Sequence, residues 1–302
     1  MKKNAIFGIS SLLLAAFIWG TAFVAQDVGM NYVAPFTFQS VRSFIGGIVL
    51  LPVVMINNSV RKRNSAFKEI KPYDKNVTLI GGICCGIVLS VAACFQQFGI
   101  KYSSVGKAGF ITALYVIFVP ICSIFLKRKI RPVVIVSSLL AAFGLYLLCM
   151  SESFSLSYGD TLLLICSLSY TAHIIIIDKF SQSADCIKMS CIQFFTAGLL
   201  SGVPMSLFEQ PNFESICLAW FPILYAGALS SGVAYTLQIV GQKHTEPTVA
   251  SLIMSLESVF AVLAGAVLLN EIPTVAEAAG CFVLFGAIIL AQLPSKKTSS
   301  NI

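Results

Sequence analysis

The chain has 302 residues, of which 57% are hydrophobic and 11% are charged, and its mean hydropathy is +0.88. So few polar residues cannot cover a water-facing surface, which excludes a soluble globular protein and predicts an integral membrane protein. The net charge of +7 does not indicate nucleic-acid binding, because the basic residues stand between long apolar segments, where they set topology and meet anionic headgroups.

Ten apolar segments are long enough to cross a bilayer, since ~30 Å of hydrocarbon requires about 20 helical residues. In chain order the predicted spans are 6–25, 34–57, 77–99, 104–126, 132–150, 159–179, 187–208, 217–241, 247–269 and 274–293. We therefore predict an all-α integral membrane fold of ten transmembrane helices. The first segment follows Lys2 and Lys3, as a signal peptide would, but Phe23 fits a small-residue cleavage site poorly, which favours a membrane helix.

The basic residues gather on one side of the predicted bundle. That side carries Lys2, Lys3, Arg61, Lys62, Arg63, Lys68, Lys71, Lys75, Lys127, Arg128, Lys129, Arg131, Lys179, Lys188, Lys243, Lys296 and Lys297. The opposite connections carry only Lys101 and Lys107. Because cytoplasmic loops are enriched in Lys and Arg, this asymmetry predicts a multi-pass protein of the cytoplasmic (inner or plasma) membrane. Both termini would be cytoplasmic, and the basic side would contact anionic lipid headgroups.

An internal repeat relates the two halves of the chain. Residues 91–148 align with 233–290 at an offset of 142, with fifteen of 58 positions identical, among them Gln96 with Gln238 and Lys101 with Lys243. Five spans per repeat is an odd number, so the two copies must cross the membrane in opposite directions. We predict two inverted five-helix repeats, residues 1–150 and 151–302, around a central cavity, which is typical of secondary transporters.

Six short motifs carry a resemblance to a known family: WGT at 19–21, FQSVRSF at 38–44, YSSVGKAGF at 102–110, YGD at 158–160, LESVFA at 256–261 and NEIP at 270–273. In this order they resemble the drug/metabolite transporter superfamily, specifically its ten-helix EamA-type branch. The resemblance implies a basket of helices around a central cavity and transport of small metabolites, often export of amino acids or related compounds. The chain departs from the family at Ser258, where many members carry proline.

Three ionisable residues fall inside predicted spans, where charge is costly. Glu257 lies about ten residues into its span and could carry a proton, or form a structural hydrogen bond between helices. His173 lies midway along its span and could line the cavity or tie two helices together. Arg42 is near enough to the outer end of its span to extend toward the interface, and could gate the cavity, attract an anion or make a structural tie.

Hydroxyl and amide side chains form a polar stripe in the eighth span, where Ser231, Tyr235, Gln238 and Gln242 recur at helical spacing. In the third span Ser90, Cys94 and Gln97 form a similar face, beside Gln96. Such groups suit a neutral or zwitterionic solute, although interhelical packing would also explain them. The predicted cavity residues are therefore Trp19, Gln96, Gln97, Tyr115, Tyr170, His173, Tyr235, Gln238 and Glu257, with Arg42 as a gating or structural charge.

These features together predict a secondary active transporter of small solutes, an exporter of amino-acid-like or small organic compounds. A passive facilitator or channel is the alternative. An integral-membrane enzyme is disfavoured because His173 and His244 are isolated and form no catalytic cluster. The ten cysteines lack metal-ligand spacing, so no metal or cofactor is predicted. The partners would be a small-molecule substrate and the bilayer, without nucleic acid, and a dimer stays open.

Overall fold

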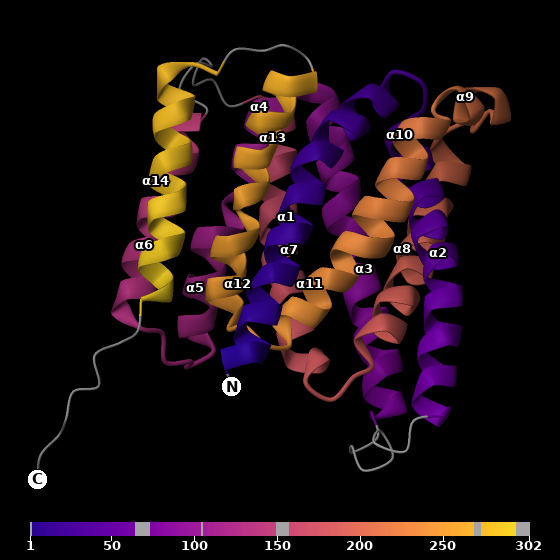
Figure 1. Cartoon of the computed structure of the whole chain (residues 1–302). Helices are drawn as coiled ribbons and strands as arrows, with labels where there is room; N and C mark the ends of the chain where they lie inside the picture. The colour runs from indigo at the N-terminus through magenta and orange to yellow at the C-terminus, as the bar shows by residue number, and fades with distance from the viewer. Residues whose placement is uncertain (1, 64–72, 104, 149–156, 269–272, 294–302) are drawn as a thin grey trace, which may run out of the picture.

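The computed structural model describes residues 2–63, 73–103, 105–148, 157–268 and 273–293. Within these ranges the chain forms a bundle of long helices without strands (Figure 1). The helices are α1 (Lys2–Met30), α2 (Pro35–Arg63), α3 (Lys75–Tyr102), α4 (Val105–Ala113), α5 (Tyr115–Phe125), α6 (Pro132–Leu148), α7 (Tyr158–Ser181), α8 (Cys186–Phe208), α9 (Phe213–Leu218), α10 (Trp220–Leu224), the π-helix η2 (Tyr225–Ala234), α11 (Tyr235–Gln242), α12 (Pro247–Met254), α13 (Leu256–Leu268) and α14 (Val275–Gln292).

The described ranges contain nine helical stretches long and apolar enough to cross a membrane, and α6, with 17 residues, is a shorter tenth. All ten predicted spans therefore correspond to helices, although residue 104 of the fourth span, residues 149 and 150 of the fifth and residue 269 of the ninth lie outside the described ranges. Large apolar side chains such as Phe208 and Phe282 are 78% exposed, whereas Gln193 and Ser201 are fully buried. A polar interior and an apolar exterior are what a lipid environment requires.

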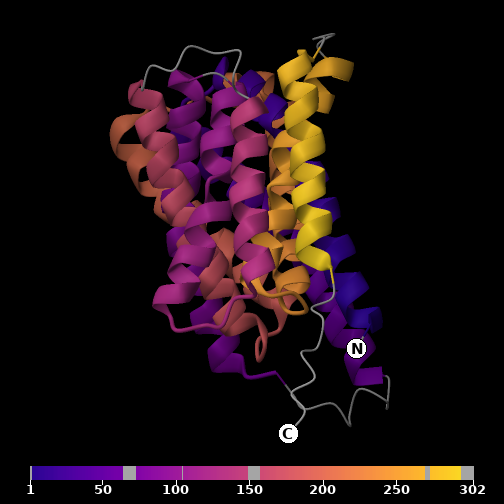
Figure 2. The same ribbon diagram turned by 90° about the vertical axis from the view of Figure 1, so that its left-hand side faces the viewer.

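The two halves of the bundle run in opposite directions. In Figure 1, α1, α3 and α6 rise from the lower end, whereas their counterparts α7, α11 and α14 descend. The contacts between helices repeat in the same way in the two halves. Helix α3 of the first half packs against α7 of the second, and the corresponding segments η2 and α11 of the second half pack against α1 of the first. The last helices of the two halves, α6 and α14, pack against each other. The described chain begins and ends at the same end of the bundle, as the turned view in Figure 2 also shows. This arrangement is consistent with the predicted inverted repeats.

Glycines allow the closest contacts between helices, and several belong to the motifs noted above. A Cβ atom on Gly20 would lie 2.5 Å from Cβ of Phe260, so the first motif packs directly on the motif at 256–261. Likewise a Cβ atom on Gly159 would lie 2.7 Å from the carbonyl carbon of Tyr102. Ser258, where many family members have proline, donates to the Gly109 carbonyl at 3.2 Å. Motifs from the two halves of the chain are thus in direct contact with each other.

Charged residues at the helix ends pair with one another. At the lower end of the bundle, Asp185 lies 3.5 Å from Arg61 and 3.4 Å from Lys188, which joins α2 to α8. At the upper end, Asp160 accepts from Ser103 at 2.6 Å and lies 3.6 Å from Lys107. Several residues invoked in the sequence analysis lie outside the described ranges, namely Lys68, Lys71, Ser104, Asn270, Glu271, Ile272, Lys296 and Lys297.

Candidate functional site

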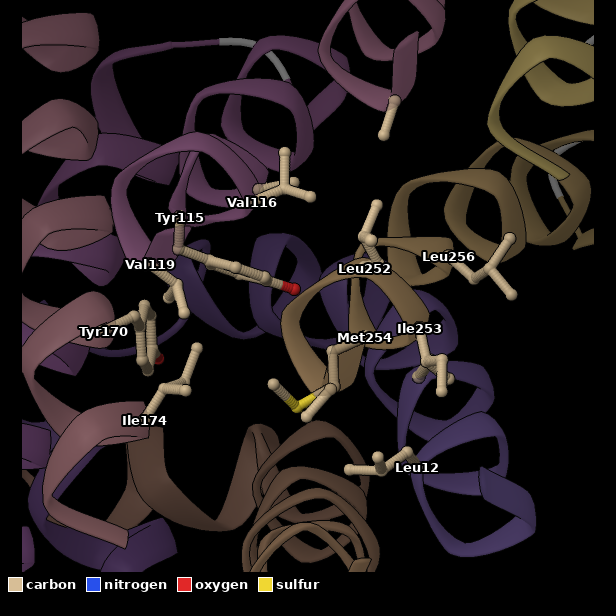
Figure 3. Packing of buried hydrophobic residues seen from close by; sticks show 14 of the residues in the cluster. Leu12, Tyr115, Val116, Val119, Tyr170, Ile174, Leu252, Ile253, Met254 and Leu256 are labelled. Carbon is tan, nitrogen blue, oxygen red and sulfur yellow. The ribbon is translucent and has the colours of Figure 1, made fainter. Parts of the chain in front are cut away.

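Two spans are broken near the middle of the bundle, and the breaks face each other. The helical run pauses at Leu114, between α4 and α5, and at Ser255, between α12 and α13. Tyr115 and Glu257 follow these breaks, and the Tyr115 hydroxyl donates to Oε1 of Glu257 at 2.8 Å. Figure 3 shows Tyr115 reaching from α5 toward the junction of α12 and α13. These two residues are partners in the repeat alignment, so equivalent positions of the two halves are in contact.

A cavity lies beside this contact, between the two halves. It contains about 470 Å³ of space between atoms, its open mouth included, and is lined by Trp19, Phe23, Gln26, Arg42, Gln96, Thr112, Tyr115, Tyr170, Ile174, Ser230, Tyr235, Gln238, Met254 and Glu257. Both repeats contribute to the wall. A few convergent polar groups among apolar and aromatic side chains are typical of small-molecule sites.

Eight of the ten predicted residues line this cavity: Trp19, Arg42, Gln96, Tyr115, Tyr170, Tyr235, Gln238 and Glu257. The other two lie nearby. Gln97 is fully buried and donates to Oε1 of Gln26, which is a cavity residue. His173 is also fully buried, and its Nε2 lies 3.1 Å from Oε1 of Gln193 on α8, which is the interhelical tie that the sequence left as one of two alternatives.

Aromatic hydroxyls and amides form one wall of the cavity. The Tyr170 hydroxyl donates to Oε1 of Gln96 at 3.1 Å and lies 2.9 Å from the Tyr235 hydroxyl. The rings of Trp19 and Tyr235 meet edge to face at 4.8 Å. Within the described chain, Nε1 of Trp19 and Oε1 of Gln238 are buried without a hydrogen-bond partner. These two lining residues therefore each have an unused polar atom that could bind a polar solute.

Arg42 turns inward instead of extending toward the membrane interface, and makes the kind of structural tie that was one of the predicted alternatives. The sequence suggested that it extends toward the membrane interface, but the side chain turns inward and is 3% exposed. Its Nε donates to Oε1 of Gln39 at 2.6 Å and its Nη1 to Oε1 of Gln26 at 2.7 Å. These hydrogen bonds to the amides of Gln26 on α1 and Gln39 on α2 hold the guanidinium inside the bundle.

In the predicted polar stripe of the eighth span, Ser230 lines the cavity in place of Ser231. Over Tyr225–Ala234 the backbone forms a π-helix, which bonds i to i+5 and advances the chain less per residue than an α-helix does. The cavity residues are consequently Ser230, Tyr235 and Gln238, whereas Ser231 packs near Gly46. In the third span, Ser90 and Cys94 lie 3.1 and 3.6 Å from Oγ of Ser201 and contact α8, and Gln96 faces the cavity instead.

Six lining residues were missed by the sequence analysis: Phe23, Gln26, Thr112, Ile174, Ser230 and Met254. Gln26 lies one residue beyond the predicted end of the first span, whereas α1 continues to Met30. A first span extended by a few residues would have included Gln26 as a polar amide inside the membrane. The apolar residues carried no signal, because they resemble any other core position. No group of His, Cys, Asp and Glu residues suited to a metal occurs in the described ranges.

Comparison with known proteins agrees with this architecture. The model of the EamA-like transporter family matches residues 6–150 and 157–293. A protein of Archaeoglobus fulgidus named "Uncharacterized transporter" is 31% identical over 93% of this chain and 84% of its own length. "Uncharacterized transporter YoaV" of Bacillus subtilis is 25% identical over 95% of this chain and 94% of its own length. A solved structure titled "Crystal structure of protein" superimposes with a TM-score of 0.77 at 18% identity, over 97% of both chains, which is a likeness of fold alone.

Proposed function

Because this chain belongs to the EamA-like transporter family, we propose that it is a secondary active transporter that moves small solutes through the central cavity by alternating access. The observation that carries the proposal is the cavity itself, which lies at the junction of two oppositely directed repeats and is lined by both. Transporters built from inverted repeats bind their substrates at such a junction. The names of the relatives support transport rather than an enzymatic role.

The solute we propose is an amino-acid-like or small organic compound, exported across the cytoplasmic membrane. The unused donor of Trp19 and acceptor of Gln238 suit a polar group, while Phe23, Ile174 and Met254 offer apolar contact. The basic residues at the lower end of the bundle favour a cytoplasmic position for that end and for both termini, next to anionic headgroups.

Counterflow in liposomes tests the mechanism. Purified protein is reconstituted into liposomes loaded with an unlabelled neutral amino acid, and a trace of the labelled compound is added outside. A carrier that rebinds its solute on each side concentrates the label transiently and saturates with rising concentration. Flux that rises linearly without saturation, and without transient accumulation, would instead identify a passive facilitator.

A further inference from the structure

One permanent positive charge lies in the cavity wall without a carboxylate partner. Arg42 is 3% exposed, lines the cavity, and is absent from all four ion pairs found in the described ranges. Its only protein hydrogen bonds there are to the neutral amides of Gln39 and Gln26. An arginine cannot lose its proton to escape the cost of burial, as a lysine can. Within the described ranges the guanidinium is therefore buried without a carboxylate at ion-pair distance, and the centroid of the Phe38 ring lies 5.8 Å from its Cζ.

The more buried carboxylates of the described ranges are engaged elsewhere, and Asp27, exposed beside Gln26, forms no ion pair with Arg42. Asp185 pairs with Arg61 and Lys188, and Asp160 with Ser103 and Lys107. The carboxylate of Glu209, at the upper end of α8, accepts from the backbone N–H groups of Phe36 and Thr37 and from the Thr37 hydroxyl. Glu257 accepts from Tyr115. None of them lies within ion-pair distance of Arg42, so the anion that would compensate it is not supplied by the described chain.

The surrounding amides hold the guanidinium in one orientation. Oε1 of Gln26 accepts from Nη1 of Arg42 and also from Nε2 of Gln97, while Nε2 of Gln26 donates to the Ala22 carbonyl at 3.2 Å. Gln39 fixes Nε from one turn earlier on α2. An arginine has five N–H donors, so both donors on Nη2 and one on Nη1 remain uncommitted. This edge of the guanidinium matches the two oxygens of a carboxylate.

We infer that Arg42 is the docking residue for a carboxylate on the transported solute, which places this chain among carriers of carboxylates with an apolar body. The inference rests on the proposed transport function and narrows its substrate class. The uncommitted edge of Arg42 binds the carboxylate in a bidentate manner, and the carbon skeleton packs on Phe23, Ile174 and Met254. A neutral amide or an amine of the same shape lacks the second oxygen and the negative charge, and is rejected.

Binding of matched compounds to the detergent-solubilised protein tests this directly. The probes are 4-methylpentanoate, 4-methylpentanamide and 3-methylbutylamine, together with 3-phenylpropanoate, 3-phenylpropanamide and 2-phenylethylamine. A ligand of the folded state raises the apparent unfolding temperature. We expect at least one carboxylate to do so, with an affinity at least about tenfold above that of its amide and amine, as loss of a hydrogen bond to a charged group implies. Equal stabilisation by amide and carboxylate, or none by either carboxylate, overturns the inference.

Two variants locate the effect. Arg42→Gln should lose the preference for carboxylates, whereas Arg128→Gln, which removes a guanidinium paired with Asp178 near the helix ends, should keep it. If Arg42→Gln does not fold, the comparison of each carboxylate with its amide on the unmodified protein still tests whether the cavity prefers carboxylates. Phosphatidylglycerol is tested in parallel, since stabilisation by this lipid and by neither carboxylate would assign Arg42 to a headgroup. If the protein binds the carboxylates but shows no counterflow, the transport proposal is refuted and this inference is not. If transport saturates but proceeds equally well with solutes that lack a carboxylate, this inference is refuted and the transport proposal is not.

Discussion

Gln26 joins three helices through a single amide. Its carbonyl oxygen accepts from Arg42 on α2 and Gln97 on α3, while the residue itself belongs to α1. Gln26→Leu would leave two buried donors without an acceptor, so we expect it to destabilise the protein by about 1–3 kcal/mol. The measurement is the apparent unfolding temperature in detergent, which should fall by several degrees. Gln182→Leu is the control, because Gln182 and its hydrogen bond to the Lys243 carbonyl at 3.2 Å are both exposed, so the unfolding temperature should change little.

Glu257 is the carboxylate in the cavity wall, and Glu257→Gln tests whether it carries protons. The amide keeps the shape and can still accept from Tyr115, so the fold should survive. We expect uptake driven by a pH gradient to be lost while solute exchange persists, because a side chain that cannot be protonated cannot couple to protons. Tyr115→Phe is the companion variant, and it should retain pH-driven uptake. Identical pH dependence in Glu257→Gln and the unmodified protein would assign this carboxylate a structural role.

Among single residues, most lining positions of the cavity could be predicted from the sequence, but the hydrogen bonds between them could not. Polar or aromatic residues inside apolar spans predicted Tyr170, Gln238 and other lining positions, because burial of such groups in lipid needs a reason. The partner of Arg42 could not be predicted, since a hydrogen bond between helices depends on their rotation about their own axes. The contact of Tyr115 with Glu257 was likewise invisible, although the alignment had already paired these two positions.

At the scale of elements, α6 and α14 pack through glycine. A Cβ atom on Gly280 would lie 2.6 Å from the Gly144 carbonyl oxygen and 3.0 Å from the Leu148 backbone nitrogen, whereas one on Gly286 meets nothing within 4 Å. Gly280→Ala should therefore push the two helices apart and cost about 1–3 kcal/mol. Gly286→Ala, on the same helix, should leave the unfolding temperature in detergent unchanged or slightly higher. Equal effects of both substitutions would show that the contact is not close.

Helix positions followed from hydropathy, but helix interruptions did not. Predicted spans such as 159–179 and 187–208 end within about two residues of α7 and α8, since lipid thickness fixes their length. The breaks at Leu114 and Ser255 and the π-helix η2 contain no proline or charge, and Glu257 and Pro222 close to two of them do not by themselves predict an interruption. They depend on packing in the finished bundle. Most of the short helix α9 lies between the predicted spans 187–208 and 217–241, and none of its residues is buried.

For the whole molecule, the topology gives a direct test. Both ends of the described chain lie at the lower end of the bundle, and the positive-inside pattern of the sequence predicts that this end is cytoplasmic. A C-terminal fusion of alkaline phosphatase should therefore be inactive, and a C-terminal fusion of green fluorescent protein should be fluorescent. Alkaline phosphatase inserted after Asn212, at the opposite end next to α9, should be active. The reverse pattern would invert the proposed orientation without altering the fold.

The hydrogen bond between Tyr115 and Glu257 has a consequence for how such a molecule moves. Two residues that a two-fold relation interchanges, and that also touch, must straddle the axis of that relation. In the proposed alternating-access cycle the two halves exchange conformations, so each contact away from the axis is replaced by the equivalent contact between the corresponding residues. This pair is carried onto itself. Within that proposed cycle, this contact can therefore persist in both conformations, close to the axis about which the two halves exchange.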